Sequence, residues 1–488
     1  MKLPIWFRAL TILLTWGLAC GLLFWVVSLR FPIDGTARFS FAFDGQSPWF
    51  NPFQPGERVT SPGRQTEGWV GQRVLGDPVY GSARLPGAYD TLDVSLEVKS
   101  LRQPIAELGL LRDEASFSFE MNPLWSEALS SGWRHVKLGE REGYVQEGLA
   151  DSALLTDDYS RLMVWQADLD TPAWSDTPGE WKTFKLSLRG AHDFHVVPAS
   201  DGHIRMRFTV QDINRSRTAK NQAAFRLTNG EETVWTESLS VSGVSDKLPS
   251  VEVEKNIDIS GLKPGVYRLS FLADDDFFIR SVSTNAKRWA IGPRLYVGDT
   301  VAYADSQALL LNWSTNSHHL AVETFHKEGL QRVALGGSTV ELKRTHTSYP
   351  LNRLPDQRVG VASLNLERGS LRMVGDGYFS PDPASLFYPS PRRLTADANP
   401  AEEGVVAVLT PLVPPERLAD GWWRVRTSWK LPASQEPLRI ALGLPGIVTR
   451  VGAFDIRHAE LMYRRPPLSW SEWWRAVRRE LASAWRRL

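Results

Sequence analysis

Three consecutive acidic residues, Asp274, Asp275 and Asp276, stand between two apolar stretches typical of strands. Three carboxylates at a hairpin tip, together with backbone carbonyls, could bind Ca²⁺. The same residues also suit a solvated turn, because an aspartate side chain accepts hydrogen bonds from nearby backbone N–H groups. No spaced Asp-x-Asp-x-Asp-Gly motif accompanies them, so the turn is the favoured interpretation. Ca²⁺ is the one cofactor that the sequence suggests.

Histidines form two groups that could in principle bind zinc. His192 and His195 lie on one segment, and His318, His319 and His326 lie on another. A zinc site requires three or four converging ligands, usually at helical or paired-turn spacing. Neither group has that spacing, so we interpret these histidines as scattered surface residues.

Motifs for catalysis are missing from the sequence. There is no Gly-x-Ser-x-Gly, no phosphate-binding glycine-rich loop before a helix and no His-Glu-x-x-His. The single cysteine, Cys20, lies inside an apolar run, which excludes a cysteine nucleophile in the rest of the chain. A glycosidase would need only two carboxylates about 5–10 Å apart, a condition that the sequence does not test. The sequence therefore favours a protein without enzymatic activity.

Tryptophan is abundant, with 20 residues, and the pair Trp422 and Trp423 is the most informative. Adjacent strand residues point to opposite faces of a sheet, so one ring should point outward unless both faces are covered. An exposed indole presents a flat apolar face on which a sugar can stack. We expect Trp422 and Trp423 to be candidate ligand-binding residues, with packing in the core as the alternative.

Residues 9–29 form an apolar run without a charged side chain. At about 1.5 Å per helical residue the run matches the ~30 Å hydrocarbon core of a bilayer, which predicts a single transmembrane signal anchor. Lys2 and Arg8 precede the run and Arg30 follows it, a balance that slightly favours a cytoplasmic N-terminus. The rest of the chain, which has no cysteine, is therefore expected outside the cytoplasm, with a cytoplasmic location as the alternative.

The last segment, residues 466–488, predicts a basic amphipathic helix with Ser469 or Ser471 as its cap. Its apolar residues recur at i, i+3, i+4 and i+7, whereas arginines crowd the other side. Tryptophan and arginine in this arrangement are typical of a helix that contacts a lipid bilayer or another membrane protein. The residues expected to make this contact are Trp470, Trp473, Trp474, Arg475, Arg478, Arg479, Trp485, Arg486 and Arg487. The alternative is a helix that packs on the last domain of its own chain.

Between these ends the sequence predicts an all-β protein of two to three β-sandwich domains, immunoglobulin-like or jelly-roll in type. Short alternating runs such as Leu92–Val98 are separated by glycines and prolines scattered along the chain. Asn229-Gly230 predicts a hairpin, and the phrase ending at Tyr267 predicts a tyrosine at a sandwich corner. We expect these domains: 1–34, cytoplasmic tip and anchor; 35–190, sandwich with a long insertion; 191–299, immunoglobulin-like; 300–465, sandwich or jelly roll; 466–488, amphipathic helix.

The net charge of the chain indicates which partners to expect, and four short sequence phrases resemble those of a protein family. Lysine plus arginine, 56, balance aspartate plus glutamate, 55, so nucleic acid is not an expected partner. Four phrases resemble those of uncharacterised bacterial envelope proteins with one anchor and several β-sandwiches: Asp77–Tyr80, Phe208–Asn214, Ile257–Tyr267 and Leu461–Pro467. The resemblance implies this fold and location but no activity.

We therefore expect a non-enzymatic, membrane-anchored envelope protein whose sandwiches bind surface glycan or a partner protein. The alternatives are a membrane-tethered polysaccharide-processing enzyme and a scaffold subunit of an envelope assembly.

Overall fold

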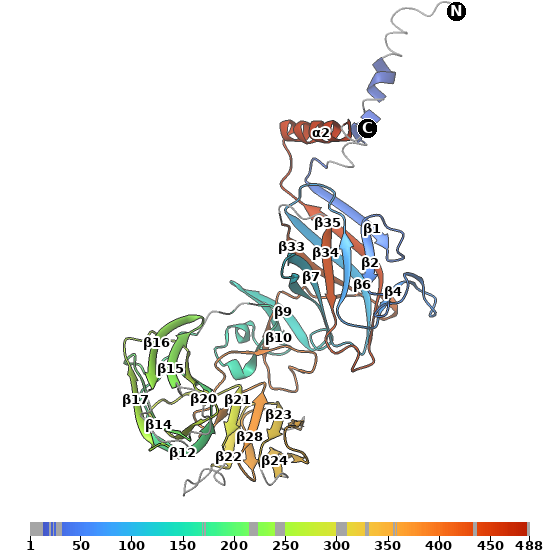
Figure 1. Cartoon of the computed structure of the whole chain (residues 1–488). Coiled ribbons are helices and arrows are strands. Elements are labelled where there is room, and N and C mark those ends of the chain that lie inside the picture. The colour runs from blue at the N-terminus through green and yellow to red at the C-terminus, as the bar shows by residue number, and fades with distance from the viewer. Residues whose placement is uncertain are drawn as a thin grey trace, which may run out of the picture. The chain divides into compact units, whose positions relative to one another are not determined.

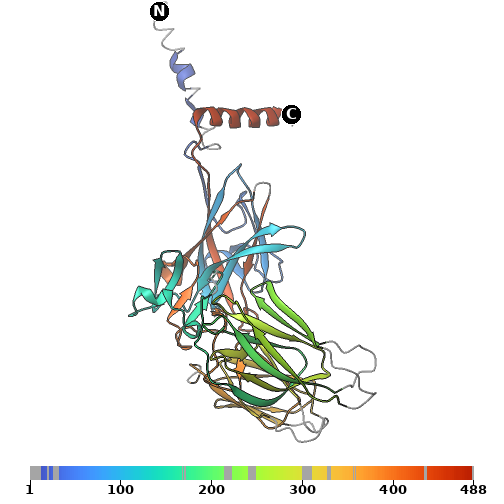
Figure 2. The same cartoon turned by 90° about the vertical axis from the view of Figure 1, so that its left-hand side faces the viewer.

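The computed structural model describes residues 13–18, 21–22, 24–25, 32–167, 169, 172–213, 223–239, 249–298, 310–326, 331–354, 357, 359–432 and 437–485. They fall into two compact units. Unit 1 comprises Met1–His135, Thr395–Asp397 and Thr410–Leu488, and unit 2 comprises Val136–Leu394 and Ala398–Leu409. Strands dominate both units (Figures 1 and 2), which confirms the predicted all-β class.

Unit 1 contains two antiparallel sheets. The seven-stranded sheet has the order β3-β4-β35-β6-β33-β32, with β1 also paired to β35. Its strands are β1 (Thr36–Ala42), β3 (Gly63–Arg64), β4 (Val70–Val74), β6 (Thr91–Leu101), β32 (Glu416–Arg417), β33 (Trp423–Lys430) and β35 (Ala453–Arg464). The five-stranded sheet, in the order β2-β5-β34-β7-β8, consists of β2 (Phe50–Gln54), β5 (Val79–Ala83), β7 (Ile105–Asp113), β8 (Ser118–Ser126) and β34 (Leu438–Gly443).

Alternation in β6 explains how the two sheets of unit 1 pack. Leu92 and Leu96 are buried, whereas Asp93 and Glu97 lie on the opposite face of the same strand. The buried face of β6 shares one hydrophobic core with side chains of the five-stranded sheet, such as Leu108 on β7, as in a β-sandwich. The other face of the seven-stranded sheet is left polar.

Unit 2 contains two large sheets around a second core. The eight-stranded sheet, in the order β17-β14-β19-β12-β21-β28-β23-β26, consists of β12 (Lys182–Arg189), β14 (Ile204–Asp212), β17 (Val253–Ile259), β19 (Phe277–Thr284), β21 (Arg294–Val297), β23 (His319–Thr324), β26 (Ser348–Asn352) and β28 (Leu371–Gly375). The ten-stranded sheet, in the order β16-β15-β18-β13-β20-β29-β22-β27-β24-β25, consists of β13 (His192–Val196), β15 (Ala223–Asn229), β16 (Glu232–Leu239), β18 (Tyr267–Leu272), β20 (Trp289–Ile291), β22 (Asn312–Thr315), β24 (Gln331–Leu335), β25 (Ser338–Leu342), β27 (Ala362–Leu366) and β29 (Phe379–Ser380). Buried apolar side chains of both sheets form one cluster.

A smaller five-stranded sheet, in the order β30-β11-β31-β10-β9, completes the sheets of the described chain. Its strands are β9 (Trp133–Leu138), β10 (Arg141–Gln146), β11 (Leu162–Val164), β30 (Arg392–Arg393) and β31 (Ala407–Leu409). β30 and β31 come after the strands of the two large sheets in the sequence. The segment 385–409 therefore completes a sheet whose first strand begins at residue 133.

The expected domain boundaries at 190/191 and 299/300 do not coincide with these units. β35 pairs with both β1 and β6, so residues assigned to the first and third domains share one sheet. β12, assigned to the first domain, pairs with β19 in unit 2. The reason is physical: alternation along a strand fixes which face is buried but not which distant strand it pairs with.

Two local predictions in unit 2 are confirmed. β15 and β16 form a hairpin in which Asn229 pairs with Glu232, so its two-residue loop begins at Gly230, which has φ 56°. The buried side chain of Tyr267 donates a hydrogen bond from its hydroxyl to the Lys263 carbonyl, at 3.0 Å. This is the sandwich-corner contact expected of the phrase that ends at Tyr267.

The predicted C-terminal helix is present as α2 (Trp470–Trp485). Ser469 caps it, because the Glu472 backbone N–H donates to the Ser469 hydroxyl oxygen, at 3.4 Å, and the Glu472 carboxylate accepts from the Ser469 backbone N–H, at 2.9 Å. This reciprocal pair is a capping box.

The predicted anchor, residues 9–29, lies largely outside the described residues. Those described within it, 13–18, 21–22 and 24–25, are helical and exposed. Within the described part of the chain, no helix has both the length and the apolar character needed to cross a bilayer.

Candidate functional site: an arginine-rich groove and two adjoining chain ends

A groove of about 510 Å³ lies on the polar face of the seven-stranded sheet in unit 1. Four neighbouring strands, β1, β35, β6 and β33, carry it, and their alternation points charged side chains away from the core. Its charged lining consists of Arg38, Arg424, Arg426, Arg464, Asp93 and Glu460.

Cross-strand ion pairs organise this lining. Arg464 lies 2.8 Å from the Asp93 carboxylate, and Arg38 contacts Glu460 through two nitrogens. Arg424 joins Glu97, at 3.0 Å, to Glu416, at 3.1 Å. Arg426 shares Glu416, at 3.2 Å.

Two carboxylates on this face have displaced pKa values. Burial raises the pKa of Asp93, and the positive charge of Arg464 opposes this shift only in part. Burial would also raise the pKa of Glu97, but hydrogen bonds from Arg457 and Arg424 outweigh it and hold that pKa below its usual range. Glu97 therefore stays ionised and fixes the two arginines.

Arg426 and Arg464 keep most of their hydrogen-bonding capacity for solvent. Their side chains are 53% and 55% exposed. Each contacts a carboxylate through one terminal nitrogen, whereas a guanidinium carries five N–H donors. The groove therefore presents several charged donors that a ligand could reach.

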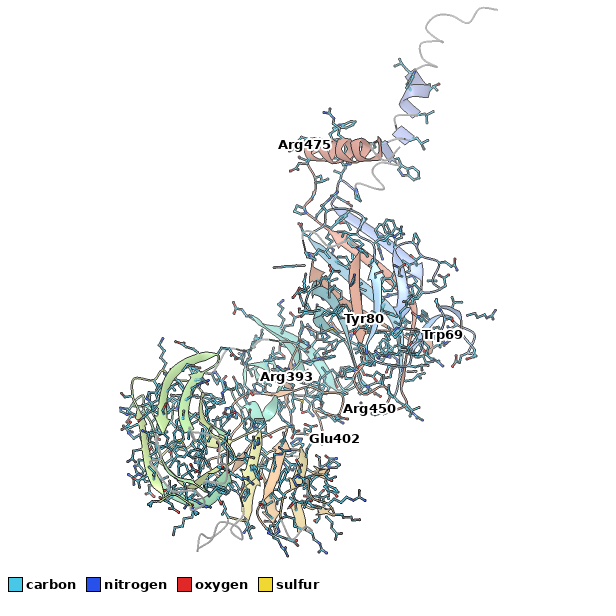
Figure 3. All side chains as sticks on the ribbon, in the orientation of Figure 1. Trp69, Tyr80, Arg393, Glu402, Arg450 and Arg475 are labelled. Atoms are coloured by element: carbon cyan, nitrogen blue, oxygen red, sulfur yellow. The ribbon has the colours of Figure 1, made fainter. Side chains whose placement is uncertain are left out.

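The predicted ligand residues Trp422 and Trp423 lie beside this face. Trp422 is 5% exposed, and its ring packs against Trp69, labelled in Figure 3, at 5.3 Å between centroids. The Arg457 guanidinium lies 4.5 Å from the Trp422 ring centroid. Trp423 is partly buried and packs on Trp125 of the core. Little of the Trp422 ring is free, and its ligand role stays a prediction.

Asp274, Asp275 and Asp276 lie in a loop that crosses from β18 to β19 in the other large sheet, not at a hairpin tip. The Asp276 backbone N–H donates to the Asp274 carboxylate at 3.0 Å, the hydrogen bond of a turn. Burial raises the pKa of Asp274, as do the nearby charges of Asp276 and Asp212. Among the described residues, no group of three or more His, Cys, Asp or Glu side chains is arranged to hold a metal ion.

The two ends of the described chain leave the seven-stranded sheet of unit 1 side by side. Thr36 at the start of β1 pairs with Arg464 at the end of β35. The Leu468 backbone N–H then donates to the Ile33 carbonyl at 3.0 Å. Further out, the Phe24 ring lies 5.8 Å from the Trp470 ring and 5.5 Å from the Trp473 ring, between centroids.

The predicted contact residues of α2 divide between a buried and an exposed side. Trp473 is 3% exposed, whereas Trp470 and Trp474 are 61% and 53% exposed. Arg475 and Arg478 are exposed as well. The side chains of Arg479, Trp485, Arg486 and Arg487 lie outside the described part of the structure.

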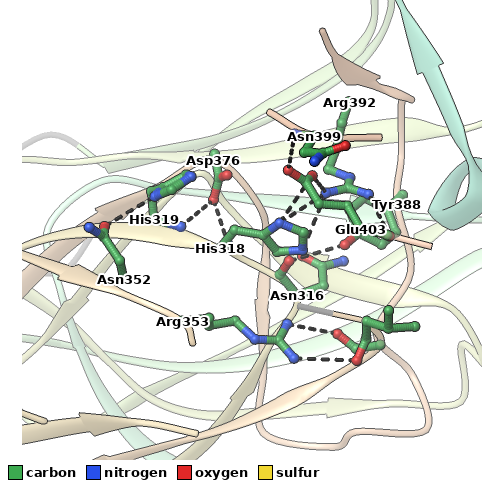
Figure 4. Close-up of polar contacts among 12 residues, drawn as sticks. Asn316, His318, His319, Asn352, Arg353, Asp376, Tyr388, Arg392, Asn399 and Glu403 are labelled. Atoms are coloured by element: carbon green, nitrogen blue, oxygen red, sulfur yellow. Dashed lines mark hydrogen bonds and ion pairs between the residues drawn. The ribbon is translucent and has the colours of Figure 1, made fainter. Parts of the chain in front are cut away.

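A buried charged cluster in unit 2 was not anticipated from the sequence (Figure 4). The Glu403 carboxylate lies 3.2 Å from the His318 ring and contacts the Arg392 guanidinium, and it accepts the Asn399 backbone N–H at 3.0 Å. Burial would raise the pKa of Glu403, but the His318 hydrogen bond and the Arg392 charge outweigh it and lower that pKa. Burial raises the pKa of Tyr388, which adjoins Arg392, to about 12.

Solvent reaches almost none of this cluster. His318 is 2% exposed and Glu403 4%. Arg392 lies in the Pro- and Asp-rich stretch 345–400 and Glu403 shortly after it, and the irregular pattern there gave no sign of a buried ion pair. The interpretation of the histidines as surface residues was also wrong for His192, His318 and His326, which are buried. His192 and His318 contact Tyr296 and Arg392, which lie far away in the chain, so local sequence does not reveal their burial.

Neither a protein-family model nor a curated protein matches the sequence. Among solved structures, the infectious bursal disease virus Gt strain aligns at 11% identity and a TM-score of 0.16, covering 88% of this chain and 86% of that chain. The infectious bursal disease virus VP2 subviral particle aligns at 10% identity and a TM-score of 0.15, covering 90% and 86%. Scores this low do not indicate a shared fold.

Proposed function

We propose that this chain is a non-enzymatic, membrane-anchored envelope protein that binds surface glycan through unit 1. In this proposal residues 9–29 cross the membrane, the N-terminus is cytoplasmic and the β-rich bulk lies outside. Its sandwiches would be of the immunoglobulin-like or jelly-roll type.

The pairing of Thr36 with Arg464 is the observation that carries the proposal. Thr36 follows the apolar run in the chain and Arg464 precedes α2, so this pairing would let both segments meet one bilayer surface. Exposed Trp470 and Trp474 suit the interfacial region, and the exposed Arg475 and Arg478 suit lipid phosphates.

The glycan part of the proposal is supported by the polar groove in unit 1. Sugars are recognised by hydrogen bonds to their hydroxyl groups, and the groove offers donors and acceptors from several strands at once. Because the anchor would hold unit 1 close to the membrane, a polymer of the cell envelope is the ligand within reach.

One flotation experiment tests both parts. The full-length protein is reconstituted into vesicles, mixed with polysaccharide from the envelope of the producing cell and floated on a density gradient. We expect protein and polysaccharide to float together, with the glycan chain length unchanged.

Each other outcome contradicts a defined part of the proposal. Protein that stays at the bottom contradicts the anchor. Protein that floats without polysaccharide contradicts glycan binding and favours the scaffold subunit. Shortened polysaccharide contradicts a non-enzymatic role and favours the processing enzyme.

A further inference from the structure

We propose that the groove of unit 1 binds an acidic polysaccharide, whose carboxylate or phosphate groups pair with Arg426 and Arg464. This inference rests on the proposed glycan binding and names both its site and its ligand class. A guanidinium is planar and matches carboxylate and phosphate groups with two parallel hydrogen bonds, which a neutral sugar does not offer.

The exposure of the charged groups, and not their number, favours an anionic ligand. Four arginines line the groove, and four carboxylates pair with them: Asp93, Glu460, Glu97 and Glu416. Arg426 and Arg464 are 53% and 55% exposed, whereas the carboxylates are less so, from 15% for Glu97 to 49% for Glu416. Arg38 is engaged by Glu460 through two nitrogens, and Arg424 holds two carboxylates. Arg38 is also exposed, at 66%. Arg426 and Arg464 each contact a carboxylate through one nitrogen, so they keep more donors for a ligand than Arg38 does.

The length of the arginine row favours a polymer over a lipid headgroup. Arg464 pairs with Thr91, which also pairs with Lys430, and Arg426 lies four residues before Lys430 on β33. At about 3.4 Å per residue this separates the two proposed ligand-binding arginines by roughly 14 Å along the strands. The headgroup layer of one leaflet is only about 5–8 Å thick, so an extended chain of sugars fits the row better.

The test uses the full-length protein in nanodiscs of phosphatidylcholine. Calorimetric titrations compare oligogalacturonate, a phosphorylated mannan oligosaccharide and a neutral malto-oligosaccharide of similar length. We expect one or both acidic probes to bind, with affinity falling as salt rises, and the neutral probe to bind at least tenfold more weakly.

The double variant Arg426→Gln/Arg464→Gln should weaken binding of the acidic probe at least tenfold. Arg439→Gln is the matched control, because Arg439 lies on the other sheet of the same unit, is 50% exposed and also pairs with a carboxylate, Glu114, at 3.1 Å. It should bind as the unaltered protein does. Thermal unfolding of all three proteins verifies that the substitutions leave unit 1 folded.

Several results would overturn the inference. If neither acidic probe binds, or if the neutral probe binds equally well, the groove does not select an acidic polysaccharide. Unchanged affinity in the double variant would show that Arg426 and Arg464 do not bind the ligand. Arginine-dependent attachment to phosphatidylglycerol vesicles alone would identify a lipid as the ligand. The flotation experiment separates this failure from that of the proposed function. If native polysaccharide still floats with the double variant, the protein binds glycan, and only the groove is ruled out as the binding site.

Discussion

Glu403 shows how a single residue can hold together distant parts of unit 2. Its carboxylate contacts His318, which follows β22, and Arg392 of β30, and both partners are almost fully buried. Transfer of such charges from water costs several kcal/mol each, so their mutual contacts decide whether the arrangement is tolerated. Removal of one partner should therefore lower the free energy of unfolding far more than loss of an ion pair at the surface does.

Glu403→Gln should lower the free energy of unfolding of unit 2 by about 3–5 kcal/mol, because it leaves the Arg392 guanidinium buried without its carboxylate. Glu341→Gln is the control: its pair with Arg332 is 58% exposed on the glutamate side and should contribute at most about 1 kcal/mol. Hydrogen exchange in urea, read on peptides covering residues 316–324, measures both. Equal effects of the two substitutions would contradict the expected role.

The stabilisation that Glu403 provides should depend on pH. Because the folded-state pKa of Glu403 is below its ordinary value of 4.5, the unfolded chain takes up the proton first as the pH falls. The stabilisation is therefore complete well above pH 4.5 and is lost as the pH falls through the folded-state pKa. The free energy of unfolding, measured from pH 7 to pH 3, should differ between the unaltered protein and Glu403→Gln by a constant amount at first. This difference should then become smaller in acid. A difference that widened in acid would contradict this assignment.

For single residues, the sequence predicted local backbone structure better than it predicted which side chains are buried or paired. The hydrogen bond of Asp274 is the turn contact that its residue type favours, a property of local backbone. The burial of His318 depends on segments 74 and 85 residues away, so no local pattern could signal it. Trp422 lies one residue before β33, where alternation does not yet apply, and Arg457 covers it from β35.

Among the elements, α2 is the one that the sequence described most completely. Ser469 was one of the two caps predicted, and its reciprocal hydrogen bonds with Glu472 identify it as the cap. The apolar spacing then predicted a helix, and Trp473 and Val477 are indeed buried.

Ser469→Ala should fray the first turn of α2, since it removes the side-chain oxygen that accepts from Glu472. A lost cap costs about 1 kcal/mol, which corresponds to roughly fivefold faster amide exchange in that turn. Exchange of α2 peptides in the full-length protein measures this. Ser471→Ala, whose hydroxyl only adjoins that of Ser469, should leave the rate unchanged. A similar acceleration in both variants would contradict the capping assignment.

Strands were predicted better than sheets. β6 follows from the alternation of Leu92 to Val98, and its two faces are as expected. That β35 lies between β4 and β6 could not be predicted, because many strands of the chain have the same alternation and apolar pattern. The groove depends on this pairing, since β35 contributes Glu460 and Arg464 beside β6.

For the molecule as a whole, unit 1 should require both ends of the sequence. Deletion of residues 453–488 removes β35, whose Phe454, Leu461 and Tyr463 side chains are fully buried in the core of unit 1. Limited proteolysis should then cut within residues 36–113, while unit 2 stays resistant. Deletion of residues 466–488 alone removes α2 and is the control that should keep unit 1 resistant. Resistance of residues 36–113 in the longer deletion would contradict the pairing.

The contact between Arg38 and Glu460 spans 422 residues, and that separation becomes a delay during biosynthesis. At about 5–20 residues per second, β1 waits roughly 20–80 s after it is made before β35 exists to pair with it. Unit 2 has all of its strands earlier and can fold in the meantime. Until then β1 and β6 carry unpaired edges, the kind of surface that aggregates, so a newly made chain should depend on a chaperone that shields its first strands.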